Sequence, residues 1–240
     1  MIPFPFFPSS AALSGINMTL QSVTNVDVSG GAGAITIPSS SAVGDIAILF
    51  NVATFGAFPW SGSTTTWSGT TIPSGWTLVD GILGTGYAAS VVCYKTLTAG
   101  EPGSTAVLTW RTSGGSTISV SANKKILMVF RPSSTITSIT VNNLTSTSDS
   151  TSSSITNSLN MLSATSTILG FGHFISPQNA DLISSYSGLT MTAEITGIGS
   201  AHRVGYLITN SGGTLQSGSM TISSFPSQLK GIQSFYLQVN

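Results

Sequence analysis

Hydrophobic and polar residues alternate in short runs along most of the chain, and Gly, Ser, Pro and Asn separate the runs. A period of two is typical of β-strands with one buried face, and those separators are typical of turns. No stretch has the 3.6-residue spacing of an amphipathic helix. The pattern predicts strands at residues 34–37, 45–53, 76–82, 88–97, 105–110, 117–120, 125–130, 136–141, 166–174, 189–195, 202–209, 219–222 and 232–239.

Short strands with turn-rich connections indicate an all-β protein. We expect a jelly-roll-like antiparallel β-sandwich built from two weakly similar halves, at about residues 31–145 and 159–240. The halves carry similar motifs in the same order, although identities are few and chance similarity is the alternative. The matched positions are Leu49 and Leu169, Trp76 and Leu189, Tyr94 and Tyr206, and Ile126 and Ile232.

The expected domain organisation is one sandwich domain at residues 31–240, preceded by an N-terminal arm and lead-in strand at residues 1–30. A Ser- and Thr-rich tract at residues 146–158 joins the halves, either as a flexible link or as one more extended strand. Because duplicated halves of a sandwich bury their apolar faces against each other, we expect a single cooperative folding unit.

Charge is scarce: only 6% of the 240 residues are charged, against about 25% in an average globular protein. Seven basic and seven acidic side chains cancel, so the chain has no net field to attract nucleic acid or anionic lipid. No apolar run approaches the ~20 residues that a membrane span needs, so we expect no membrane insertion. Weak self-repulsion suits a protein that packs against its own copies or against neighbours in an assembly.

Several motifs combine a strand with a turn. Val43-Gly-Asp leads into an apolar strand, and Asp45 can accept hydrogen bonds from loop amides. Pro73-Ser-Gly-Trp is a turn that delivers Trp76 to the core, and Glu101-Pro-Gly-Ser is another turn. The single cysteine, Cys93, lies in an apolar run and is interpreted as a small core residue.

These motifs, together with Tyr94-Lys-Thr-Leu-Thr-Ala-Gly-Glu-Pro-Gly and Met128-Val-Phe-Arg-Pro, resemble a duplicated β-sandwich module of bacteriophage structural proteins and bacterial surface proteins. The resemblance covers residues 31–240, and the second half departs from it by having Leu189 where the first has Trp76. It implies a structural role in a virion, as a tail, fibre or capsid-decoration protein. It brings no catalytic residues that match position by position.

Groups for catalysis are few and scattered. No two of the seven carboxylates lie within six residues of each other, and no Gly-x-Ser-x-Gly elbow occurs. His173 and His202 are interpreted as structural or surface residues, and one cysteine with two isolated histidines does not support a zinc site. We therefore expect a non-enzymatic protein without a cofactor or metal. A glycan-degrading enzyme whose carboxylates meet only in the fold is the weakest alternative.

Two tryptophans, Trp60 and Trp67, flank a Ser- and Thr-rich segment, which the pattern above predicts to be a loop between strands. Exposed indoles on such a loop can stack on sugar rings. They are candidate contacts for a host surface glycan, and a carbohydrate-binding or adhesin module is therefore the alternative function. The competing interpretation is that both indoles tuck under the loop as a small satellite core.

The N-terminal segment at residues 1–10 is apolar but carries three prolines, Pro3, Pro5 and Pro8, which would break the helix of a signal peptide. The prolines favour an extended arm, which is suited to docking in a groove. We expect the arm to dock onto other virion proteins or copies of this chain; folding back onto its own sandwich is the alternative. The candidate docking residues are Ile2, Phe4, Phe6 and Phe7.

Overall fold

A computed structural model of the chain describes most of the sandwich. The described residues are 15–28, 30–54, 70–83, 88–111, 117, 120, 122–149, 154–160, 166–176, 182–197, 200–210, 217–223 and 230–240. Within these ranges every regular element is a β-strand and every named strand pairing is antiparallel. The prediction of an all-β, antiparallel β-sandwich is confirmed. Its jelly-roll detail stays a prediction.

The first eight strands form two sheets, and the next eight repeat their arrangement. The first inner sheet has the order β1-β8-β3-β6-β5, and the first outer sheet has the order β2-β7-β4. Their bounds are β1 Met18–Val28, β2 Ala32–Thr36, β3 Ile46–Thr54, β4 Thr70–Thr71, β5 Thr77–Leu83, β6 Ala88–Thr96, β7 Thr105–Trp110 and β8 Ala122–Pro132.

In the second half, the inner sheet has the order β9-β16-β11-β14-β13 and the outer sheet the order β10-β15-β12. Adding eight to each strand number of the first half gives these orders, so the two halves share one topology. The bounds are β9 Ile139–Asp149, β10 Ser154–Asn160, β11 Thr167–Ser176, β12 Leu182–Ser187, β13 Thr190–Gly197, β14 Ser200–Thr209, β15 Ser217–Ser223 and β16 Lys230–Val239.

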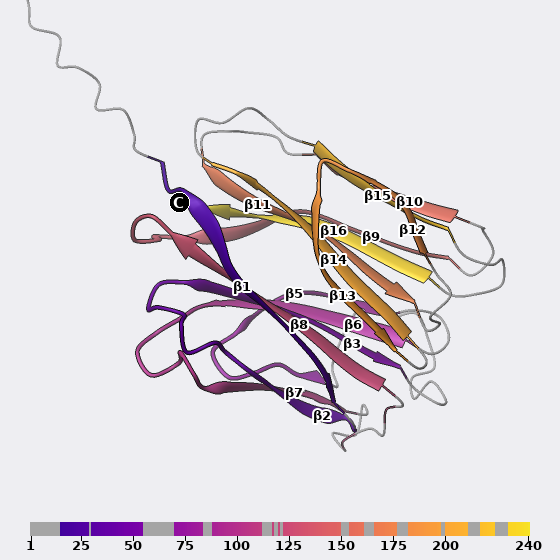
Figure 1. Ribbon diagram of the computed structural model, residues 1–240, viewed down its shortest axis with the longest axis horizontal. Coiled ribbons are helices and arrows are strands. Elements are labelled where there is room, and N and C mark those ends of the chain that lie inside the picture. Colours follow the sequence, from indigo (N-terminus) through magenta and orange to yellow (C-terminus); the bar gives the residue numbers. More distant parts are fainter. Residues whose placement is uncertain are drawn as a thin grey trace, which may run out of the picture.

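The four sheets stack as four layers, with the two inner sheets face to face and an outer sheet on each outside (Figure 1). Each inner sheet therefore lies between two others. On the second side, a Cβ atom added to Gly218 of β15 would lie only 3.3 Å from Cδ2 of Leu207 in β14, which shows how closely the second outer sheet approaches the second inner sheet.

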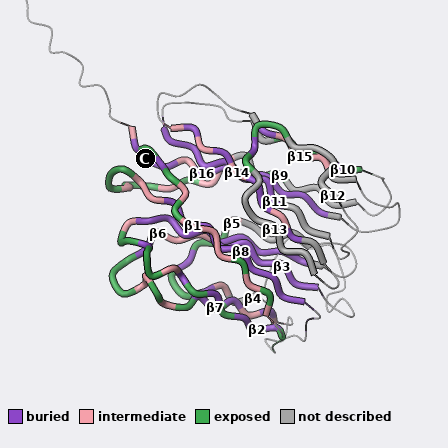
Figure 2. Tube along the Cα trace, in the orientation of Figure 1, coloured by how far each residue is buried: buried purple, intermediate pink, exposed green. Residues whose placement is uncertain are grey.

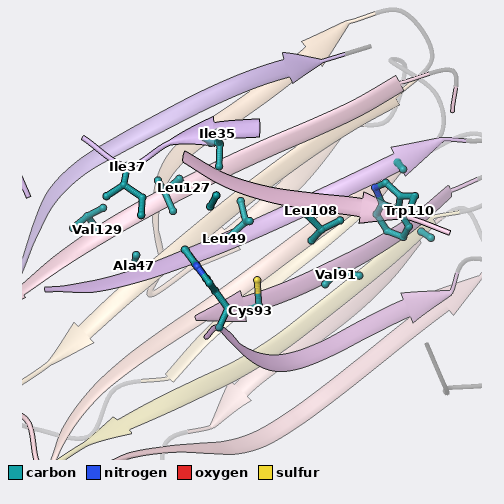
Figure 3. Packing of buried hydrophobic residues seen from close by; sticks show 14 of the residues in the cluster. Ile35, Ile37, Ala47, Leu49, Val91, Cys93, Leu108, Trp110, Leu127 and Val129 are labelled. Carbon is teal, nitrogen blue, oxygen red and sulfur yellow. The ribbon is translucent and has the colours of Figure 1, made fainter. Parts of the chain in front are cut away.

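Between the first outer and first inner sheets lies the first core (Figure 3). Ile35 and Leu108 of the outer sheet pack toward Leu49 of the inner sheet, and the fully buried Trp110 closes one end. Cys93 is buried in the same core, as the sequence predicted. Burial raises the pKa of its thiol, so the sulfur is held as the neutral SH group.

Between the two inner sheets lies a second core, which joins the halves. Phe50 contributes from the first sheet, and its ring centroid is 5.6 Å from that of Phe171 in the second sheet. Phe171 in turn stacks on Phe235, with 5.2 Å between centroids. Because this core takes side chains from both halves, neither half buries its inner face alone.

Burial on two faces explains the apolar run at the start of β3. All nine residues of β3 are buried, and the tube in Figure 2 shows β3 and β8 buried along most of their length. Ala47 and Leu49 point to the first core, whereas Ile48 and Phe50 point to the core between the halves. A strand covered on both faces needs apolar residues at successive positions.

Strand pairing divides the chain at a different place from the sequence pattern. β1, assigned to the lead-in segment, pairs with β8 along its whole length and is an edge strand of the first inner sheet. β9 pairs with β16 and so belongs to the second half. The division falls at residues 133–138, because β9 already begins at Ile139 and the Ser- and Thr-rich tract supplies only its end and most of β10.

Candidate functional site

The core between the halves becomes polar toward one end. Here His173 of β11 and His202 of β14 are both fully buried, and their Nε2 atoms are 2.7 Å apart. One imidazole therefore donates a hydrogen bond to the other. His173 also packs edge-on against Phe50 of the first half, with ring centroids 5.1 Å apart. The pair links two strands of one half directly beneath the sheet of the other.

Burial keeps both imidazoles neutral. It lowers the pKa of His173 to about 3, an effect that a hydrogen bond with Gln233 partly opposes. It also lowers the pKa of His202 well below the usual value, and His173, Lys124 and Lys125 add to that effect. Lys124 is itself buried, with its Nζ 4.0 Å from the carboxylate of the half-exposed Asp27. The group is thus a neutral imidazole pair beside a cation.

This arrangement is unsuited to a metal ion. A neighbouring ammonium group opposes a second cation, and structural zinc needs four ligands. Among the residues that the structure describes, no three His, Cys, Asp or Glu side chains lie close enough to hold a metal. The pair's chemistry is proton binding, which burial opposes while the core stays closed.

Acid should therefore weaken the fold through these two residues. In the unfolded chain a histidine binds its proton near pH 6.5, whereas folded His173 binds it only near pH 3. Between these values the unfolded state holds more protons, so the free energy of unfolding falls as the pH falls. For each histidine, the slope should rise toward about 1.4 kcal/mol per pH unit as the pH falls below 6.5.

Urea unfolding between about pH 7 and pH 5, above the range where most carboxylates titrate, measures this slope. The double variant His173→Asn with His202→Asn is the control, since it keeps polar side chains at both positions but removes the titrating groups. An equal slope in the variant and the natural chain would show that other residues cause the acid sensitivity.

A second buried polar group lies in the first core, on the opposite face of the first inner sheet. Lys125 donates hydrogen bonds to Oδ1 of Asn51 at 3.1 Å and to Oδ1 of Asn123 at 2.8 Å. Asn51 also donates to Asn123, at 2.8 Å. Asn123 donates to the carbonyl of Gly30, which ties the turn after β1 to β8. Burial lowers the pKa of Lys125 to about 7.

Sequence reasoning missed this network. The signal was present in Asn123, Lys124 and Lys125, which come just before an apolar run. The sequence pattern left the first two outside the predicted strand and placed Lys125 at its start. The strand in fact begins at Ala122. Three successive buried polar residues need partners from other strands, and only strand pairing shows that Asn51 lies opposite Lys125.

The predicted turns are confirmed. The backbone N–H of Ala42 donates to the carboxylate of Asp45, at 2.8 Å. The buried Asp45 also accepts two hydrogen bonds from Arg131, each 2.9 Å long.

Trp76 is 9% exposed and belongs to the first core, and Gly75 before it has φ +77°, as a turn of this kind requires. The Glu101 turn is closed by a hydrogen bond from Ser104 N to Glu101 O.

Two adjoining hollows lie on the surface beside the linker between the halves, at residues 133–138. One has a volume of about 330 Å³ and the other of about 500 Å³, within the range of ligand pockets. Thr96 and Ile136 line both, so we treat the two as one surface and call it the junction groove. The hollow that Val43 lines is mainly apolar, and the other hollow adds hydroxyl groups.

The candidate contact residues from the sequence lie elsewhere. Trp60 and Trp67, the candidate glycan contacts, are outside the described residues. So are the candidate docking residues of the arm, namely Ile2, Phe4, Phe6 and Phe7. The structure therefore leaves both assignments as predictions. It does bring together His173 and His202, which the sequence treated as separate structural or surface residues.

Comparison with known proteins adds no relative. No protein-family model, curated protein or solved structure matches this chain. In the part of the chain that the structure describes, no helix has the length and apolar character needed to cross a membrane.

Proposed function

We propose that this protein is a non-enzymatic structural component of a bacteriophage particle, a tail, fibre or capsid-decoration protein held in the particle by its apolar N-terminal arm. The motif resemblance described above suggests the class of particle. Low charge and a hydroxyl-rich sequence suit close packing among neighbours. Four stacked sheets, with one core shared by the two halves, suit a rigid building block.

The observation that carries the proposal is the way in which the root of the arm is fixed. Asn17 exchanges hydrogen bonds with Ser133: its N–H donates to Ser133 Oγ at 2.9 Å, and its carbonyl accepts from Ser133 N at 2.8 Å. The N–H of Met18 donates to Asn210 of the second half at 3.0 Å, and Thr167 donates to the carbonyl of Ile16. Both halves therefore hold the root.

A firm root matters because an arm anchors a protein only if it transmits force to a folded body. Ile16 is buried in the core between the halves, so a force applied to the arm would be transmitted to both halves. Docking three phenylalanines could contribute about 1.5–3 kcal/mol for each side chain before the costs of association are subtracted.

Purified particles from the source of this sequence test the proposal. We expect mass spectrometry to find the chain in them at a fixed ratio to the major structural proteins. A chain with Phe4, Phe6 and Phe7 changed to Ser keeps the length and prolines of the arm, and should fold but be lost from particles. Absence of the natural chain from washed particles would refute the proposal.

The glycan-binding alternative depends on Trp60 and Trp67. A glycan array probed with the natural chain and with the variant Trp60→Ala, Trp67→Ala tests it directly. A specific signal that disappears in the variant would support an adhesin function, which a fibre protein can combine with a structural one. Signal in neither protein would remove the alternative.

A further inference from the structure

The junction groove has the properties of a docking surface. Val43, which lines one end, is 66% exposed, and Ile136 in the middle is only partly buried. Tyr94 and Ile139, both partly exposed, line the other end. Apolar side chains that gather in a hollow on a surface otherwise rich in hydroxyl groups mark a contact site.

The charged groups near the groove are already paired. Arg131 is bound to Asp45 through two hydrogen bonds, and Lys95 forms an ion pair with Glu101. The groove thus offers apolar contacts and hydroxyl groups without an unpaired charge from either ion pair. A segment without charged side chains fits such a surface better than an acidic or basic one.

The chain itself has a segment of that kind, and the root of that segment is fixed beside the groove. Residues 1–10 contain three phenylalanines and three prolines, and they carry no charged side chain. Asn17, at the root of the arm, is hydrogen-bonded to Ser133, and Ser133 lines the groove. Asn240 bonds to the same linker, so this end of the molecule is where the C-terminus label stands in Figure 1.

We propose that the junction groove receives the N-terminal arm of a second copy of this chain. At ~3.1 Å per residue, the ten steps from Phe7 to Asn17 span about 30 Å when fully extended, which is long enough to reach the groove of a second copy. A copy placed opposite lies within that reach. Because root and groove share one end of the molecule, two copies related by a two-fold axis can exchange arms in a closed contact.

This inference rests on the proposed function only in taking the arm as a docking segment. Arm exchange in solution needs no particle, so the two ideas fail separately. A dimer that exchanges arms but is missing from particles would refute the virion role alone. A chain found in particles that never dimerises would refute the exchange alone.

Sedimentation of the natural chain over a range of concentrations is the first test. We expect a reversible dimer, and a monomer when residues 1–10 are deleted. The variant Val43→Glu places a charge in the groove at a well-exposed position, and should weaken the dimer at least about tenfold. Val107→Glu, at a position on β7 that is 45% exposed and outside the groove, is the matched control and should leave the dimer unchanged.

A synthetic peptide of residues 1–10 provides the second test. It should bind to the chain that lacks these residues, and the Val43→Glu change should reduce that binding by a similar factor. A natural chain that stays monomeric and rejects the peptide, while the shortened chain binds it, would show that the arm occupies its own groove and would overturn the proposal. So would a dimer that Val43→Glu leaves intact, or a folded shortened chain that does not bind the peptide.

Discussion

Cut at the linker, the two halves of this protein will fail to fold separately. Expressed alone, residues 1–134 and residues 135–240 should each be insoluble or should melt without a cooperative transition. The reason is the core between the inner sheets, where Phe50 and Phe130 of one half contact Phe171 of the other. Each separated half would expose a whole sheet face of buried apolar residues to water.

In the matched control, the chain is cut at the same place, but only after it has folded. A protease site placed between Ser134 and Thr135, which are both exposed, can be cut in the folded chain. We expect the two pieces to remain together in gel filtration and to unfold in one transition. Two soluble fragments that each melt cooperatively would instead show that the halves are independent domains.

The largest single-residue effect should come from Phe171→Ala in the same core. Phe171 is fully buried, and its ring contacts those of Phe50, Phe130 and Phe235 at centroid distances of 5.6, 5.8 and 5.2 Å. Removing it leaves a cavity lined by rigid rings that cannot close, so the free energy of unfolding should fall by about 3–5 kcal/mol.

Urea unfolding at neutral pH measures this loss. The control is Val107→Ala, which shortens a side chain that is 45% exposed. It should change the free energy of unfolding by less than about 0.5 kcal/mol. If Phe171→Ala costs no more than the control, the inner sheets do not pack in the way described.

The internal repeat shows how far sequence comparison reaches. It matched β3 with β11, β6 with β14 and β8 with β16, and the shared strand order gives these pairs equivalent places. It aligned Leu49 with Leu169, yet Leu49 points to an outer sheet and Leu169 to the core between the halves. A shift of one residue reverses every side chain of a strand, and similar apolar residues on both faces hide the shift.

Local patterns were sufficient to predict the all-β class, most strands and the turns at Asp45, Trp76 and Glu101. Alternation and turn residues act over a few positions, so they can be read without knowing the fold. The same patterns placed the boundary between the halves in the Ser- and Thr-rich tract, because a polar run resembles a link. Polar edge strands such as β9 carry little apolar signal.

Only the tertiary structure decided which faces meet. It stacks two inner sheets, and thereby places His173 beside His202, and His202 near Lys124, in a shared interior. It also pairs Asn51 with Lys125 across strands, and brings the root of the arm, the linker and the C-terminus to one end. A sequence fixes the alternation within each strand, but which layer covers a face depends on contacts between residues far apart in the chain.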